Sequence, residues 1–260
     1  MSTEEKVRLG GMALGNGVLV HGPTSWACAV RLPSGELKVA SARKRIRSSG
    51  VNNPLLRGPA RLAEVFALLP ELRRRLPEAE LPFQRPSILG AMAGAGVAVR
   101  VVRSAPRLRP AAQELVSGLL ALAPALLALR GGELAAYHGA EHVSIGSYEQ
   151  GKRVGREHER CGGHLVGPLV ATTALGNLLA ARAPLRYRGP ARLAASLGAI
   201  AASMELFGWM VKNPRNPLAR ALSKPGHELQ HRLSTAEPSP EQLEVAEAAL
   251  AACLELEQAA

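Results

Sequence analysis

The stretch LAASLGAIAASMELFGWMV, residues 193–211, contains a single charged residue, Glu205. A membrane-spanning helix needs about 20 predominantly apolar residues, and roughly 17 are tolerated. The stretch Leu165–Ala181 also reaches that length and carries no charge. Both segments are therefore long and apolar enough to be membrane-spanning helices.

Two shorter segments, Pro86–Val99 and Leu115–Leu129, also lack charge. The first reaches spanning length only with Arg100, which can extend its guanidinium to the headgroups. The second contains Pro124, and helices in membranes tolerate proline. An Ala-rich soluble bundle is the alternative, favoured by a mean hydropathy of only +0.03. Both short loops, 104–114 and 182–192, contain arginines, so the positive-inside rule does not predict which side of the membrane each loop faces.

The N-terminal part has a different pattern, with short apolar runs broken by glycine. WACAVRL and ELKVAS flank Pro33-Ser34-Gly35, which predicts a β-hairpin within a small β unit over residues 8–42. KRIRSSGVNNP, residues 44–54, is typical of a linker. Helical spacing follows from Leu55, with a break predicted at Pro70.

The C-terminal part predicts one amphipathic helix, with Ser239 as N-cap and Pro240 as its first residue. The predicted fold is therefore mainly α: a small N-terminal β unit, a multi-helix, membrane-embedded region and a C-terminal helix. The predicted segments are these: residues 1–43, the β unit; 44–86, linker and helices; 87–236, the helical membrane region; 237–260, the C-terminal helix.

Charge and cysteine content restrict the class of protein. The net charge of +11 favours anionic partners, either nucleic acid or an anionic membrane face. The basic residues are scattered and aromatic residues make up only 3%, so no nucleic-acid-binding face is predicted. Three widely spaced cysteines do not form a disulfide framework, and the N-terminus MSTEEKVRLGG has no secretory signal pattern, so a reducing compartment is expected.

Four of the seven histidines lie in YHGAEHVSIGSYEQGKRVGREHERCGGH, residues 137–164. His138 and His142 share one face of a helix and could bind one metal ion. With Glu141 between them they match the H-x-x-E-H pattern of zinc hydrolases, in which the glutamate is the general base. Glu149 returns to the same face, as a ligand or as an acceptor that orients an imidazole. The alternative is a pair of surface histidines.

A second cluster, HERCGGH, places His158, Cys161 and His164 three residues apart. Imidazole and thiolate are ligands that suit zinc. The alternative for Cys161 is a buried apolar thiol. A carboxylate such as Glu205 is energetically costly inside an apolar helix unless it has a partner, and a metal or a histidine would be suitable. The alternative is that the apolar helix ends at Met204 and Glu205 is exposed.

These motifs together resemble the YqhQ-like family, a family of unknown function (domain of unknown function family 1385) described as predicted metal-dependent multi-pass membrane proteins. The resemblance covers nearly the whole chain. It rests on LGGMALGNGVLVHGP, ACAVRLPSGEL, Pro54–Gly58, YHGAEH with YEQG, HERCG, Glu205 and PGHELQHRLSTAEPSPEQLEVAEAAL. It implies a membrane protein with a metal site at His138, Glu141, His142, His158 and Cys161.

The chain departs from the family pattern at three positions near the N-terminus. Met12 and Asn16 stand where the family usually has Gln and Glu, and His21 stands where Arg is common. His164 lies outside the family pattern and ranks below His158 and Cys161 as a ligand.

The predicted function is a metal-dependent membrane enzyme, of hydrolase type, with an unknown substrate. The predicted metal set is His138, His142, His158, Cys161, Glu149 and Glu205, holding a divalent ion, zinc by preference, with Glu141 as catalytic base. The alternative is a non-catalytic membrane scaffold or assembly factor with a structural site closed by four ligands. Expected partners are membrane lipid, the substrate and further copies of the chain in a homo-oligomer, but no nucleic acid. The expected location is the cell membrane, multi-pass, with the termini and the His/Cys site cytoplasmic.

Overall fold

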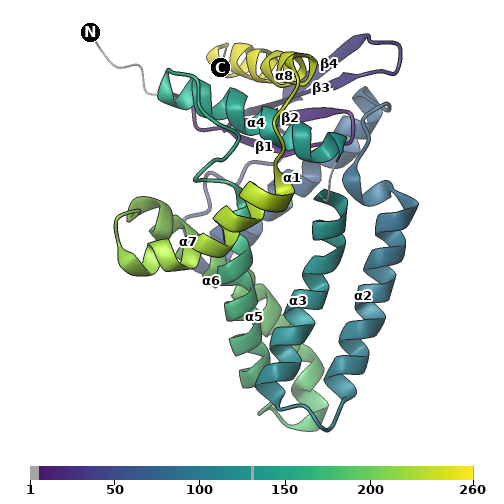
Figure 1. Ribbon diagram of the computed structural model, residues 1–260. Coiled ribbons are helices and arrows are strands. Elements are labelled where there is room, and N and C mark those ends of the chain that lie inside the picture. The colour runs from purple at the N-terminus through teal and green to yellow at the C-terminus, as the bar shows by residue number, and fades with distance from the viewer. Residues whose placement is uncertain (1–5, 130–131, 260) are drawn as a thin grey trace.

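The computed structural model describes residues 6–129 and 132–259, and its elements follow the predicted order (Figure 1). The strands are β1 Gly10–Ala13, β2 Gly17–His21, β3 Ser25–Arg31 and β4 Leu37–Arg43. The α-helices are α1 Pro54–Arg75, α2 Pro86–Ser104, α3 Pro110–Leu129, α4 Glu133–Gln150, α5 Val166–Ala180, α6 Arg188–Lys212, α7 Pro217–Leu229 and α8 Pro240–Gln258. Short turns of helix are η1 Pro82–Gln84, η2 Gly162–Leu165, η3 Leu185–Tyr187 and η4 Gln230–Ser234.

The four strands form one antiparallel sheet in the order β1-β2-β3-β4. The predicted hairpin is confirmed: β3 and β4 pair from Ser25 and Arg43 to Arg31 and Leu37. Its turn contains Gly35, whose φ of +88° is a conformation that suits glycine. The N-terminal β unit therefore forms from local sequence signals.

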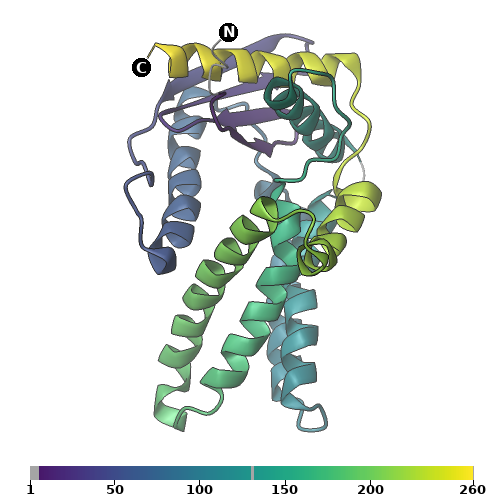
Figure 2. The same ribbon diagram turned by 90° about the vertical axis from the view of Figure 1, so that its left-hand side faces the viewer.

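Both faces of the sheet are covered, which explains why β2 and β3 are buried along nearly their whole length. Figure 2 shows α8 lying across one face and α1 on the other side of the sheet. The first face packs against α4 and α8 through Ala13, Val18, Val20, Ala27 and Ala29. The opposite face packs against α1 through Leu14, Leu19, Trp26, Cys28 and Val30. We call the sheet with α1, α4 and α8 the head domain.

Helix α8 closes the head domain although it lies at the far end of the chain. Its N-terminus is the predicted Ser239, which forms a capping box with Gln242. Near its C-terminus, Glu257 accepts hydrogen bonds from the backbone and hydroxyl of Ser25, at 2.7 and 2.6 Å. The division into four segments stays a prediction, but the first and last of them share one hydrophobic core.

Helix α1 runs from Pro54 to Arg75 without interruption, so the predicted break at Pro70 is wrong. Leu68, Leu69 and Leu72 are buried against the sheet on either side of that proline. Proline removes one backbone hydrogen bond from the helix, but the packing of these leucines keeps the helix continuous there. Tertiary contacts outweigh the local preference of proline.

Within the described part of the chain, four helices are long and apolar enough to cross a bilayer, and they indicate a membrane protein. The candidate spans are Pro86–Ser104, Ala112–Leu129, Gly162–Ala180 and Leu185–Lys212. At most 22% of each span is buried within the chain, so large apolar side chains such as Val97, Leu119 and Leu193 face outward. Helices α2, α3, α5 and α6 extend together away from the head domain (Figures 1 and 2). We call these four helices the bundle.

Close contacts hold the bundle together. The hydroxyl of Thr172 on α5 donates to the carbonyl of Ala199 on α6 at 3.1 Å. A Cβ at Gly176 would lie only 3.2 Å from that of Ala195, so the two helices approach closely at small residues. Glu114 accepts from Arg103 and from Asn177, each at 2.9 Å, which ties α2, α3 and α5 together.

Candidate metal centre

Helix α4 carries the His pair through the interior of the head domain. It packs between β1 and α8, and its middle residues are almost all buried. His138 and His142 lie on successive turns of one face, as their spacing predicts, and their ring centroids are 4.3 Å apart. The helix ends at Gly151, whose φ is +68°. Beyond Gly151, the chain returns along α4, and it brings the Arg156 carbonyl to His142 and Cys161 to His138.

Backbone carbonyls hold both imidazoles in one orientation. His138 Nδ1 donates to the carbonyl of Ser234 at 2.6 Å, and His142 Nδ1 donates to the carbonyl of Arg156 at 2.7 Å. Each bond sets the tautomer and leaves Nε2 as an acceptor. Metal-binding histidines are oriented in this way in known sites. His142 is buried and His138 is partly buried, so the two rings are not a pair of surface histidines, and their orientation suits metal ligands.

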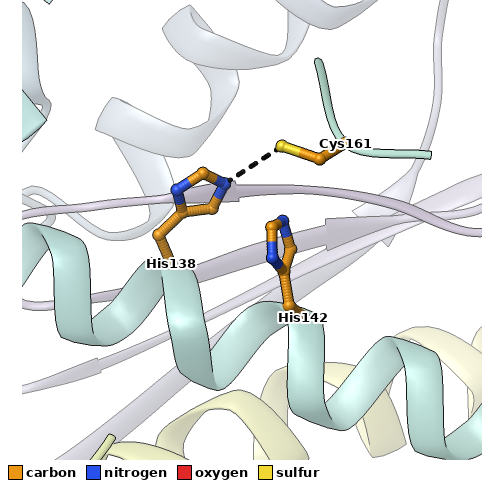
Figure 3. Close-up of side chains that lie close together, drawn as sticks. All are labelled: His138, His142 and Cys161. Atoms are coloured by element: carbon orange, nitrogen blue, oxygen red, sulfur yellow. Dashed lines mark hydrogen bonds between the residues drawn. The ribbon is translucent and has the colours of Figure 1, made fainter. Parts of the chain in front are cut away.

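Cys161 supplies the third donor. Figure 3 shows its side chain directed at His138, beside the His142 ring. The Sγ atom lies 3.5 Å from His138 Nε2 and accepts from the backbone N–H of Gly163 at 3.3 Å. One ligand atom from each of His138, His142 and Cys161 lies within 4.8 Å of the others. A tetrahedral zinc with bonds of ~2.0 Å to nitrogen and ~2.3 Å to sulfur separates those two donors by about 3.5 Å. The three residues could therefore bind a metal ion.

Burial sets the charge state of this cluster. It lowers the pKa of His142 to about 3, with a contribution from His138, and it also lowers the pKa of His138. Both imidazoles are thus neutral, as metal ligands must be. Burial raises the pKa of the Cys161 thiol to about 12. A bound cation reverses that effect, because it stabilises the thiolate.

Glu141 lies beside the cluster and is covered by the first strand. Its Oε2 is 4.0 Å from His138 Nε2, and its side chain is buried. A Cβ at Gly11 on β1 would lie 2.5 Å from Oε1 of Glu141, so the strand backbone passes close over the carboxyl group. Burial raises the pKa of Glu141 to about 7. The carboxyl group is close enough to act on a molecule bound at the three donors.

The structure places His158 and Glu149 next to the cluster but outside the three-donor group. His158 Nε2 lies 3.2 Å from Glu149 Oε2, and its Nδ1 accepts from the backbone N–H of Arg160 at 3.3 Å. Glu149 also pairs with the Arg160 guanidinium. Because both nitrogens of His158 have protein partners, Glu149 acts here as the acceptor that orients this imidazole.

Glu205 has the partner that its position requires, but that partner is Arg57 of α1 and not a metal or a histidine. The guanidinium Nε and Nη2 of Arg57 contact the two carboxylate oxygens of Glu205. The helix continues past Met204 to Lys212, so the alternative in which it ends there is wrong. A bidentate pair of this kind satisfies a carboxylate in apolar surroundings.

This pairing predicts separate effects on stability and on metal content. Glu205→Gln keeps the side-chain shape but leaves the Arg57 guanidinium without its counter-charge. The thermal midpoint of unfolding should fall, while metal content stays unchanged. The double variant Arg57→Leu, Glu205→Leu should recover part of the loss, because no unpaired charge remains. A decrease in bound metal, measured by elemental analysis, would contradict the placement of Glu205 away from the cluster.

His164 is buried but faces away from the donors. Its Nδ1 donates to the carbonyl of Ser223 at 3.0 Å, and its Nε2 lies 2.9 Å from Gln230 Nε2. A Cβ at Gly226 would lie 2.5 Å from the His164 Cα. His164 therefore connects η2 to α7 and η4.

The N-terminal departures from the family pattern have different positions. His21 lines the polar cavity beside the cluster, where its Nδ1 is 3.0 Å from Lys44 Nζ. Met12 lines a larger apolar cavity on the other side. Asn16 is remote from both, and it holds the loop at Glu78 and Glu80 through bonds of 3.0 Å each. His21 and Gly11 line this polar cavity although neither is among the predicted site residues. The departure of His21 from the family pattern and the glycine-rich start of the chain were the signals for them.

Two cavities meet at the cluster. The polar one has a volume of about 170 Å³, and His21, His142, His158 and Arg160 lie on its wall. The apolar one has a volume of about 570 Å³ and extends toward α2 and α3. His138, Glu141 and Cys161 belong to the walls of both.

Comparison with known proteins gives a family match for the second half of the chain. Residues 133–256 match the family model "Protein of unknown function (DUF1385)". The match begins with α4 and runs into α8, so it contains all three donors, Glu141 and Glu205. No curated protein and no solved structure matches the chain. The resemblance of the first 132 residues to the family stays a prediction. Residues 133–256, just under half of the chain, are therefore similar to the DUF1385 family of proteins of unknown function.

Proposed function

We propose that this chain is a metal-dependent membrane hydrolase whose catalytic centre is the His138, His142 and Cys161 cluster. One observation carries the proposal: three convergent donors, two with their tautomers set by backbone carbonyls, lie beside a buried carboxyl group. A structural site is closed by four protein ligands, whereas a catalytic site retains an open position. The engagement of both His158 nitrogens elsewhere favours the catalytic type.

Zinc is the ion that this donor set fits best. Two imidazoles and one thiolate are soft to intermediate ligands, which zinc prefers over magnesium or calcium. A bound zinc ion supplies Lewis acidity, which lowers the pKa of a water molecule and polarises a carbonyl or phosphoryl oxygen.

The residues around the donors have distinct roles in this proposal. Glu141 accepts the proton of the attacking water and passes it to the leaving oxygen. The reaction breaks one acyl–oxygen or phosphorus–oxygen bond and consumes one water molecule. The carbonyls of Ser234 and Arg156 orient the imidazoles, and Gly11 allows β1 to shield the carboxyl group from bulk solvent.

We place the head domain on the cytoplasmic side of a cell membrane that α2, α3, α5 and α6 cross. The first strand and the last helix both lie in the head domain, as an even number of crossings requires (Figure 1). All three cysteines are free, and Cys161 must remain reduced to bind metal. A reducing compartment meets that requirement.

The test is the substitution Glu141→Gln, with Glu133→Gln as its control. Glu133 lies on the same helix and is exposed. Purified, zinc-loaded protein is assayed against 4-nitrophenyl acetate and bis(4-nitrophenyl) phosphate, with bound zinc measured in each sample. Glu141→Gln should keep its zinc and lose about 10²–10⁴-fold in rate, the usual contribution of a general base. Glu133→Gln should match the unsubstituted protein. Unchanged activity in Glu141→Gln at full zinc occupancy would favour the scaffold alternative.

A further inference from the structure

The apolar cavity connects the metal-binding cluster to the bundle. At one end it is bounded by His138, Glu141 and Cys161, and at the other by Ile88 and Met92 of α2 and Ala125 of α3. Both helices are candidate membrane spans. The cavity therefore begins at the candidate catalytic centre and ends among residues that the bilayer surrounds.

The distribution of polarity along this cavity is strongly asymmetric. Among the described residues that line it, the polar side chains are those of His138, Glu141 and Cys161, all at the cluster end. No described lysine or arginine lies on its wall. A peptide occupant would bring backbone amides into a region with no partner for them, at a cost for each unpaired group. A hydrocarbon chain has no such requirement.

The cavity also reaches a depth at which acyl chains lie. Met92 is six residues beyond the start of α2, which corresponds to about 9 Å along the helix axis. Met92 is 50% exposed and Leu89 is 53% exposed, so the wall is continuous with the outer apolar surface of the bundle. A chain could enter sideways from the bilayer without crossing water.

We propose that the substrate is a membrane lipid whose acyl chain occupies this cavity and whose polar end lies at the metal-binding cluster. The identification rests on the proposed metal-dependent function. The volume of about 570 Å³ lies within the roughly 300–1,000 Å³ of ligand pockets. The polar cavity on the opposite side of the cluster, about 170 Å³, accommodates the headgroup and water.

The test measures how carboxylate binding depends on chain length, with Co²⁺ as the reporter ion. Full-length protein in nanodiscs is loaded with Co²⁺, whose visible spectrum responds to a carboxylate ligand. It is then titrated with acetate, butyrate, hexanoate and octanoate. Affinity should rise with length, by up to about fourfold for each methylene that becomes buried.

Two matched substitutions locate the effect. Ala125→Phe fills the cavity, whereas Ala93→Phe adds the same ring on α2 at an exposed position outside it. Both proteins experience the same partitioning of carboxylates into the nanodisc. Ala125→Phe should bind acetate normally but lose most of the chain-length dependence, and Ala93→Phe should retain it. Normal acetate binding shows that a variant is folded, and Ala121→Phe replaces Ala125→Phe if that variant fails this criterion.

The outcomes separate the two levels of the proposal. If Co²⁺ binds and acetate and octanoate bind equally well, the lipid assignment is wrong and the metal site stands. If Ala125→Phe leaves the chain-length dependence intact, the acyl chain does not occupy this cavity. Failure of the unsubstituted protein to bind Co²⁺ would overturn both the metal-dependent function and the lipid assignment.

Discussion

Replacing His142 by alanine should abolish stoichiometric metal binding. His142 is buried, its Nδ1 is fixed on the Arg156 carbonyl, and its remaining nitrogen is one of three convergent donors found among the described residues. Loss of an outer partner of a ligand costs about 10–100-fold in metal affinity, so loss of the ligand itself should cost more. Cys161→Ala should have the same effect. Elemental analysis after dialysis against a known free-zinc concentration measures both.

Stability provides a second measurement of the same site. A metal present at about 100 times its dissociation constant stabilises the folded state by about 2.7 kcal/mol. The thermal midpoint of the unsubstituted protein should therefore rise with added zinc, while that of His142→Ala should not respond.

Two histidine substitutions serve as controls, because they show whether zinc binding depends on this cluster or on histidines elsewhere in the protein. His227→Ala changes an exposed histidine of α7 that pairs with Glu157, and it should leave both measurements unchanged. His158→Ala should keep its zinc, because both nitrogens of His158 are engaged by Glu149 and Arg160. Full zinc occupancy in His142→Ala would show that the zinc binds elsewhere in the protein. Zinc loss in His158→Ala would make it a fourth ligand.

Replacing Gly139 by alanine should lower both stability and metal affinity, although the residue donates no ligand. A Cβ at this position would lie 2.1 Å from the carbonyl oxygen of Ala236, and backbone cannot move aside as a flexible side chain can. The segment 234–236 is fixed there by the Ala236 N–H bond to Ala135 O, at 2.9 Å, and by the bond from His138 to Ser234. Overpacking of this kind costs about 1–3 kcal/mol.

The effect on metal follows from the His138 contact. If the added methyl group displaces residues 234–236, His138 loses the carbonyl that sets its tautomer, and affinity should fall by about 10–100-fold. Gly155→Ala is the matched control, because a Cβ there meets nothing within 4 Å. Zinc titration and thermal unfolding of the two variants test the difference. Equal behaviour of Gly139→Ala and Gly155→Ala would show that residues 234–236 do not support the site.

Much of the architecture could be predicted because its signals are local. The turn at Pro33–Gly35, the cap at Ser239 and the His138/His142 pair each depend on residues a few positions apart. Helix and hairpin geometry convert such spacing directly into position. The charge-poor spans are similarly local, since a helix that crosses the hydrocarbon core needs a continuous apolar stretch of about 20 residues.

Which residues become donors of the cluster does not depend on local sequence signals. His158 and Cys161 lie three residues apart and suit zinc equally well, but Cys161 faces His138 while Glu149 and Arg160 engage His158. Which of them reaches the cluster depends on how the loop beyond Gly151 returns across α4. Likewise, the charge of Glu205 predicted a partner, but only the packing of α1 against α6 identified Arg57.

The sequence by itself determined the element order, the candidate spans, the His138/His142 pair and Glu141 between them. Tertiary structure alone decided that the glycine-rich first strand covers Glu141, that α8 returns to the sheet on which α4 packs, and that the cluster opens toward α2 and α3. The physical reason is the range of the interactions. Hydrogen-bonded helices and turns are specified over a few residues, whereas burial of a common core joins segments more than a hundred residues apart.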